Sequence, residues 1–182
     1  MKLADADILI LPGLGNAGPG HWQLRWAERM NTAAVVEQAD WDEPDLDDWV
    51  STIDQACRLT SRPVVLVAHA LAVAAVAHAA ARLPDNVRGA FLVAPTDVEL
   101  SPAVSEEAFG FRPIPREPFP FPSMLVASGN DPYVSLERAV EFANCWGSDF
   151  HQAGDAGHID LASGHGPWPE GLLMFTRLMQ RL

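Results

Sequence analysis

The most constraining stretch of the chain is an apolar run, Val64–Val67, that passes directly into the residues Ala68-His69-Ala70-Leu71-Ala72. Consecutive aliphatic and β-branched residues predict a strand that is buried on both faces, which is typical of a parallel sheet covered by helices. The small side chains after the run allow a helix to begin close against the end of the strand. The stretch therefore predicts a buried parallel strand, a sharp turn and a helix over residues 71–82.

Strand-length apolar runs recur along the chain and alternate with helical stretches. The expected strands are residues 6–11, 33–38, 64–67, 89–94, 124–128 and 149–152. The expected helices are residues 20–31, 46–59, 71–82, 135–144 and 169–182. Such alternation predicts the α/β class, with a parallel-rich central sheet and helices on both faces, in a single domain over residues 1–182. The proline-rich stretch 101–122 predicts an irregular loop over one end of the sheet, with no separate cap domain.

The charge balance restricts the possible partners. The chain carries 24 acidic and 12 basic side chains, a formal charge of −12, and has no basic cluster. Phosphate groups would be repelled, so we expect no binding to nucleic acid or to an anionic membrane surface. Small neutral or cationic substrates are the expected partners.

Targeting signals are not expected either. The apolar N-terminal stretch contains Asp5 and Asp7 and lacks the basic start of a signal peptide. No apolar run approaches the roughly 20 residues of a membrane span. Cys57 and Cys145 have no metal-like spacing and are expected to be reduced thiols, which favours a cytoplasmic location.

The five residues after the buried strand resemble the G-x-S-x-G turn that carries the nucleophile of α/β-hydrolases, with Ala70 in the place of the serine. Ala68 and Ala72 occupy the outer positions, where small side chains let strand and helix approach closely. Ala70 has no oxygen with which to attack a substrate. The chain is therefore expected to have an α/β-hydrolase fold and, as written, to be inactive.

An acyl-transfer serine needs a histidine to accept its proton and a carboxylate to orient that histidine, in the chain order Ser, Asp, His for this fold. Asp131 follows the fifth expected strand, and His158 lies in a glycine-flanked loop after the last one. Both are candidate catalytic residues. Two structural alternatives stay open, because Asp131 can simply shape a turn and His158 can be an exposed loop histidine.

A glycine-containing loop follows the first expected strand. Gly13 and Gly15 allow backbone N–H groups to turn toward a ligand, and the residue after the nucleophile supplies a second donor. The candidate oxyanion donors are therefore the N–H groups of Leu14 and Leu71. A tight strand-to-helix turn is the structural alternative for the glycines. No Lys-Ser/Thr pair follows them, so the loop is not a phosphate-binding P-loop.

Further matches to one family occur in order along the chain. They are Leu11-Pro12-Gly13-Leu14-Gly15-Asn16, Gly20-His21-Trp22, Asp40-Trp41, Val67-Ala68-His69, Asn130-Asp131-Pro132-Tyr133, Trp146-Gly147 and Gly157-His158-Ile159. On these motifs the chain resembles, over nearly its whole length, the small serine hydrolases of the retinoblastoma-binding-protein-9 family, also called the YdeN-like group. The resemblance implies a Ser-Asp-His triad at position 70, Asp131 and His158. The chain departs from the family pattern at the nucleophile, where alanine replaces the serine.

The residues expected to bind the substrate lie in the loop after the first expected strand, at the start of the helix that follows it, and in the turn around Ala70. They are Gly13, Gly15, Asn16, His21, Trp22 and His69. The resemblance implies that the His21-Trp22 pair lines the pocket or fixes the loop, while packing alone is an equal alternative for Trp22. His69 and His78 are most simply packing or surface histidines.

Histidines and carboxylates also gather toward the end of the chain, at His151, Asp155, His158, Asp160 and His165. Imidazole and carboxylate groups can together bind zinc or a related ion. Their spacing matches no metal motif, however, and we expect no metal site and no cofactor.

Three interpretations of Ala70 remain open. The chain can be an inactivated variant of an enzyme with serine at this position, a natural pseudoenzyme that binds a ligand or partner, or an enzyme of different chemistry on the same fold. We favour the first, because the acid, the base and the glycine loop are all retained. The expected parent activity is hydrolysis of a small carboxylic ester or amide through an acyl-enzyme, with His158 as general base and Asp131 as its orienting partner.

Overall fold

The computed structural model describes residues 1–182 and contains one six-stranded sheet. The strands are β1 (Asp7–Leu11), β2 (Ala33–Val35), β3 (Val64–His69), β4 (Val87–Val93), β5 (Ser123–Ala127) and β6 (Asp149–Gln152). The helices are α1 (Trp22–Arg29), α2 (Leu46–Arg58), α3 (Leu71–Ala79), α4 (Leu136–Trp146) and α5 (Pro169–Arg181). All strands pair in parallel, in the order β2-β1-β3-β4-β5-β6. The predicted α/β architecture is confirmed, with a sheet that is parallel throughout.

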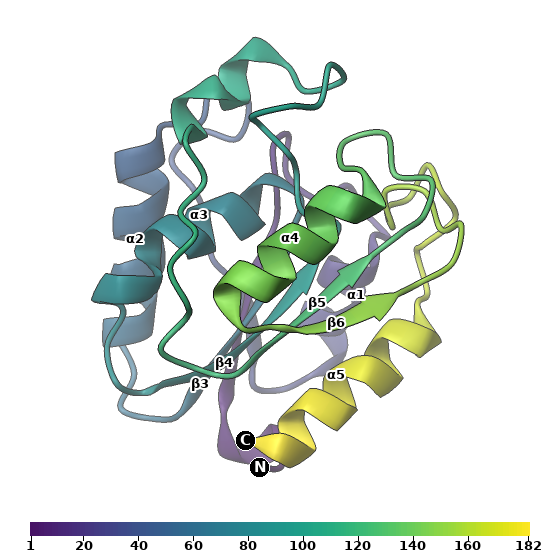
Figure 1. The fold of residues 1–182 in the computed structure, drawn as a ribbon. Helices are drawn as coiled ribbons and strands as arrows, with labels where there is room; N and C mark the ends of the chain where they lie inside the picture. The colour runs from purple at the N-terminus through teal and green to yellow at the C-terminus, as the bar shows by residue number, and fades with distance from the viewer.

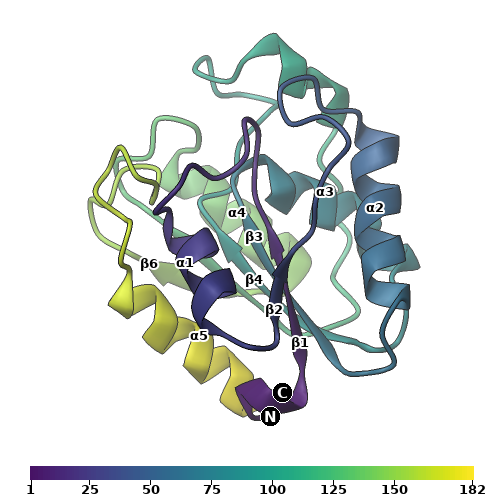
Figure 2. The same ribbon diagram turned by 180° about the vertical axis from the view of Figure 1, so that it is seen from behind.

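Two helical layers cover the sheet, one on each face (Figure 1, and from behind in Figure 2). On one face, side chains such as Leu9 and Leu66 pack with α2, α3 and α4. On the other face, side chains such as Ile8 and Val65 pack with α1 and α5. Successive residues of a strand point to opposite faces, so a strand covered on both sides is apolar at every position.

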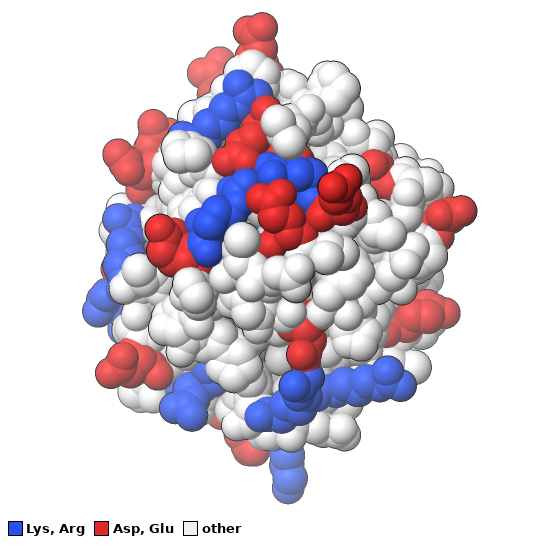
Figure 3. Space-filling view, viewed as in Figure 1, with Lys and Arg blue, Asp and Glu red and all other residues white.

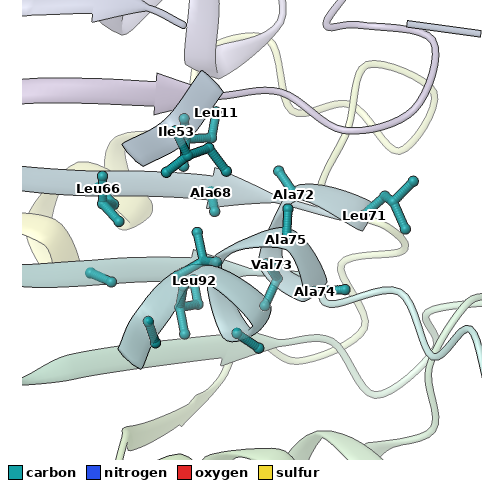
Figure 4. Close-up of a cluster of buried hydrophobic side chains, with 14 of the residues drawn as sticks. Leu11, Ile53, Leu66, Ala68, Leu71, Ala72, Val73, Ala74, Ala75 and Leu92 are labelled. Carbon is teal, nitrogen blue, oxygen red and sulfur yellow. The ribbon is translucent and has the colours of Figure 1, made fainter. Parts of the chain in front are cut away.

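Strand β3 lies at the centre of the sheet between β1 and β4, and every one of its residues is buried. Helix α3 follows it after a single residue, and its buried side chains are mostly alanine and valine. Figure 4 shows Ala72 and Ala75 of this helix in the same apolar cluster as Ala68 and Leu92 of the sheet. The turn between β3 and α3 therefore stands at the carboxyl edge of the sheet, where open parallel sheets place their sites.

The structure differs from the expected elements mainly at their ends. Strand β2 ends at Val35 rather than at residue 38, and α3 gives way to a short 3₁₀ segment, Ala80–Arg82. The stretch 101–122, expected to be irregular, contains another 3₁₀ segment, Glu106–Phe111. The ring of Phe111 is buried edge-on against Trp49 of α2, which anchors this segment to the helical layer.

The surface carries mixed charge. On the face shown in Figure 3, basic and acidic side chains are interleaved in the upper part, and several basic side chains gather along the lower edge. Helix α4 lies at the front in this view, and its Arg138 forms ion pairs with Asp97, Glu99 and Glu141. No helix combines the length and the apolar character that crossing a membrane requires.

Candidate active site

Ala70 forms a strained turn between β3 and α3. Its backbone angles are φ 54° and ψ −123°, a conformation that residues with a β-carbon rarely adopt and that costs about 1–3 kcal/mol. Hydrogen bonds hold the turn, since the N–H of Ala70 donates to the carbonyl of Val93 and the N–H of Val73 donates to the carbonyl of Ala70, both at 3.1 Å. A strained residue at the carboxyl end of the central strand has the geometry of a nucleophile elbow.

Small neighbours permit this turn. Ala68 and Ala72 are buried on either side of it, and Gly13 of the loop after β1 lies directly against it. A β-carbon added at Gly13 would lie 2.9 Å from the β-carbon of Ala70 and 3.2 Å from the nitrogen of Leu71. The loop therefore approaches the elbow this closely only because residue 13 has no side chain.

Replacing Gly13 with alanine should lower the free energy of unfolding by about 1–3 kcal/mol, because the added methyl group is forced into the elbow. The matched control is Gly18→Ala in the same loop, where the new β-carbon would meet only Leu161 Cδ1, at 3.5 Å. Urea denaturation of both variants measures the difference. Equal urea midpoints for the two variants would mean that residue 13 does not need to lack a side chain for the loop to pack against the elbow.

His158 and the buried Asp131 form a hydrogen-bonded pair. His158 Nδ1 lies 3.0 Å from Asp131 Oδ2 and 3.1 Å from Oδ1. An ionised carboxylate only accepts hydrogen bonds, so Nδ1 carries the proton and the lone pair of the neutral ring is on Nε2. The N–H of Tyr133 donates to Asp131 Oδ1 at 2.9 Å, and the Tyr133 ring packs edge-on against His158. This is the arrangement of a general base held by its orienting carboxylate.

Two polar side chains after β5 hold the loop that carries His158. Ser128 Oγ accepts from the N–H of Ala156 at 2.8 Å, and Asn130 Oδ1 accepts from the N–H of Gly157 at 2.7 Å. These hydrogen bonds fasten the loop after β6 to the end of β5. The residues around Asp131 therefore position the histidine loop as well as the histidine ring.

Two aromatic residues hold the same loop from the other side. Trp22 is fully buried, and its Nε1 donates to the carbonyl of Ile159 at 2.9 Å. His69 Nε2 lies 2.9 Å from the carbonyl of His158 and must be the donor there. Burial lowers the pKa of His69 well below its usual value, so the ring stays neutral at pH 7. His69 is thus a positioning residue for the candidate base, not merely a packing histidine.

His21 is a second neutral histidine, at the start of α1. Its Nδ1 accepts from the N–H of Gln23 at 3.2 Å, so the proton of the neutral ring is on Nε2. Burial lowers the pKa of His21 to about 4. The His21 ring lies beside that of His69, with 5.1 Å between the centroids. Near neutral pH neither of these two rings carries a positive charge.

The N–H groups of Leu14 and Leu71 are available to a ligand. Leu71 is the first residue of α3, where N–H groups have no partner within the helix, and the N–H of Leu14 makes no hydrogen bond within the protein. Gly15 shapes the loop after β1, which carries Leu14. Its φ is 73°, and its N–H donates to the carbonyl of Trp41 at 2.8 Å.

A cavity of about 400 Å³ brings the candidate residues together. Ala70, His158, Leu14 and Leu71 line it, as do some of the residues expected to bind a substrate, namely Gly13, Asn16, His21 and His69. The side chain of Asp131 is fully buried behind His158 and contacts that ring rather than the cavity.

Two residues expected to bind a substrate do not line the cavity. Trp22 belongs to the buried aromatic layer, where its ring packs against Trp26 and Trp168. Gly15 faces the Trp41 carbonyl through its N–H. Both residues act on the site through the backbone segments that they hold in place.

Sequence reasoning missed several cavity residues. They are Thr96 after β4, Val104, Ser105 and Ala108 from the stretch 101–122, Tyr133 after β5, and Asp160 and Leu161 after His158. A position just beyond a parallel strand could have indicated Thr96. The sequence offers no signal for which part of a long loop folds over the site.

The acidic and histidine residues near the C-terminus are not gathered around a common point. No group of three or more His, Cys, Asp or Glu side chains is arranged to hold a metal ion. His165 Nδ1 lies instead 3.2 Å from Ser163 Oγ, and Ser163 in turn hydrogen-bonds Asp160.

A model of the serine hydrolase family matches residues 8–177. The chain belongs to this family. The match includes the elbow, Asp131 and His158, so the whole candidate site falls within it. No curated protein sequence matches the chain.

Solved structures show the same fold as this serine hydrolase. One from Pectobacterium atrosepticum, described as a YdeN-like hydrolase, is 29% identical, with a TM-score of 0.86 over 97% of this chain and 92% of its own. The ydeN gene product of B. subtilis is 17% identical, with a TM-score of 0.80 over 96% and 99%. Thermogutta terrifontis esterase 2 is 14% identical, with a TM-score of 0.72 over 100% and 85%. The predicted α/β-hydrolase fold is confirmed.

Proposed function

We propose that this serine hydrolase is built to hydrolyse a small carboxylic ester or amide through an acyl-enzyme, and that the chain with Ala70 is its inactive form. One observation carries the proposal: Ala70 holds a strained elbow in the same cavity as the paired His158. Such strain persists only where the surrounding structure enforces it. In this fold the elbow serves to expose a nucleophile.

With a serine at position 70, each residue has a defined role. The serine Oγ attacks the carbonyl carbon while His158 Nε2 accepts its proton, and Asp131 stabilises the imidazolium that forms. The N–H groups of Leu14 and Leu71 donate to the oxygen that becomes negative. His158 then gives the proton to the leaving group, and water deprotonated by the same nitrogen releases the acid.

The volume of the cavity fits a small substrate. Its volume of about 400 Å³ is near the lower end of ligand pockets, which run from about 300 to 1,000 Å³. Thermogutta terrifontis esterase 2, which shares the fold, is known in a form phosphonylated by cyclosarin. A fluorophosphonate is therefore a suitable probe of the elbow.

The direct test is labelling of the Ala70→Ser variant. A fluorophosphonate needs a hydroxyl activated by a base, so the variant should label while the chain with Ala70 stays unlabelled. A folded Ala70→Ser protein that does not label would show that position 70 is not the nucleophile position.

A second candidate function is that of a natural pseudoenzyme that binds a small molecule or a protein. The observation that favours it is alanine at the elbow of a cavity whose backbone donors, at Leu14 and Leu71, are still available. In this case the cavity recognises a ligand and no chemistry follows.

A small ester or acyl-amide should protect the chain with Ala70 against heat, because much of the ground-state binding does not depend on the nucleophile. At a concentration of about 100 Kd the stabilisation is roughly 2.7 kcal/mol, which raises the melting temperature by several degrees. A thermal-shift screen of the parent chain beside Ala70→Ser measures it. Ligands consumed only by the serine form support the enzyme, whereas ligands that bind both forms and are consumed by neither favour the pseudoenzyme.

We also propose that the chain belongs to the retinoblastoma-binding-protein-9 branch of the family and works in the cytoplasm. The ordered motifs from Leu11 to Ile159 support the first statement. Both cysteines, Cys57 and Cys145, are unpaired, as in proteins of a reducing compartment. The formal charge of −12 supports a small neutral or cationic substrate over a nucleic acid.

A further inference from the structure

The cavity around Ala70 has an uneven charge. Eighteen residues line it, and none of them is lysine or arginine. Asp160 is the one acidic residue among them. Two of the three lining histidines, His21 and His69, do not balance this acid, because they are neutral near pH 7. The third, His158, is paired through Nδ1 with the Asp131 carboxylate.

The carboxylate of Asp160 is held in place by one of its oxygens. Asp160 Oδ1 accepts from the N–H and from the Oγ of Ser163, both at 2.9 Å. Asp160 Oδ2 has no hydrogen-bond partner within the protein, and Asp160 takes part in no ion pair. Burial alone would raise the pKa of Asp160, but the two hydrogen bonds from Ser163 bring it below its usual value. The carboxylate is therefore ionised at neutral pH, with one oxygen free.

Such a carboxylate attracts one class of ligand. An ammonium group that enters the cavity gains a partner for its charge, and the partly buried site screens that attraction less than bulk water does. A carboxylate on the ligand would be repelled by the same group. A neutral ligand of equal size without a hydrogen-bond donor gains no such partner at Asp160.

On the basis of the proposed function, we propose that Asp160 is the specificity-determining residue of this cavity. It selects small esters and amides that carry an ammonium group over neutral compounds of the same size, and it discriminates against those that carry a carboxylate. The serine hydrolase family assignment alone does not distinguish these substrates.

Three ligands of similar size test the proposal by calorimetry on the protein with Ala70. They are β-alanine ethyl ester (cationic), ethyl butanoate (neutral) and monoethyl succinate (anionic). We expect the cationic ester to bind about two- to fivefold more tightly than the neutral one, as for a partly exposed ion pair, and the anionic ester to bind most weakly. Equal affinities for the cationic and neutral esters would overturn the proposal without any variant being needed.

The Asp160→Asn variant assigns the preference to this side chain. Asparagine keeps an oxygen that can accept from Ser163, so the turn is retained while the charge is lost. The preference should fall to about equal affinity for the three ligands. Asp42→Asn, a change of the same kind at an exposed loop residue outside the cavity, should leave the preference unchanged. A preference that survives Asp160→Asn would place its origin elsewhere.

Hydrolysis by Ala70→Ser separates this proposal from the proposed function. If the variant turns over all three esters at similar kcat/KM, the selection by Asp160 is wrong and the esterase function stands. If it turns over none of them while the cationic ester still binds preferentially, the esterase function is wrong and the selection stands.

Discussion

Replacing Ala70 with serine is expected to convert an inert protein into an esterase, with turnover of p-nitrophenyl acetate or butyrate raised on the order of 10⁶-fold, the loss seen when a triad enzyme lacks its nucleophile. The backbone at position 70 already has φ 54° and ψ −123°, so the new hydroxyl requires no rearrangement of the turn. The paired His158 and the two backbone donors line the same cavity. Steady-state hydrolysis of both esters by the parent and variant measures the gain.

A hydroxyl elsewhere in the cavity should not have this effect. Ala162→Ser is the matched control, because Ala162 lines the cavity at an exposed loop position away from the elbow. It should leave the protein as inactive as the parent. Equal activity in both serine variants would show that a hydroxyl anywhere in the cavity supports hydrolysis. An inactive but folded Ala70→Ser protein would show that position 70 is not the nucleophile position.

The elbow and the sheet could be predicted because their signals are local. Val64–Val67 is apolar at every position because β3 is covered on both faces, and Ala68 and Ala72 are small because strand and helix meet there. Asp131 and His158 each follow a strand, and parallel strands bring their carboxyl ends to one edge. Their approach in space therefore followed from their order in the chain.

The walls of the cavity depend on contacts between distant segments, which the sequence alone does not reveal. Trp22 adjoins a cavity histidine in the sequence, yet its indole turns inward to the carbonyl of Ile159. The 3₁₀ segment Glu106–Phe111 lies among prolines that predict a loop, and its burial comes from packing on Trp49. In the same way, the free oxygen of Asp160 exists only because of how the chain turns after it.

The second large effect concerns Asp131 in the active background. In the Ala70→Ser protein, Asp131→Asn should lower kcat on the order of 10⁴-fold, as loss of the orienting carboxylate does in triad enzymes. Asp131 accepts from His158 Nδ1 and from the N–H of Tyr133. An asparagine amide that kept its oxygen on the Tyr133 N–H would turn its NH₂ toward Nδ1, which moves the histidine proton to Nε2 and removes the lone pair that must accept the serine proton.

The matched control for this variant is Asp155→Asn. It removes a charge from an exposed residue in the loop that carries His158 and leaves the hydrogen bond between His158 and Asp131 in place. It should retain the activity of the Ala70→Ser protein within a small factor. Fluorophosphonate labelling should slow in parallel with hydrolysis in Asp131→Asn, because both reactions need the same activated oxygen. If Asp131→Asn kept most of the activity while folded, the pair with His158 would be structural, and the base would have to act without an orienting carboxylate.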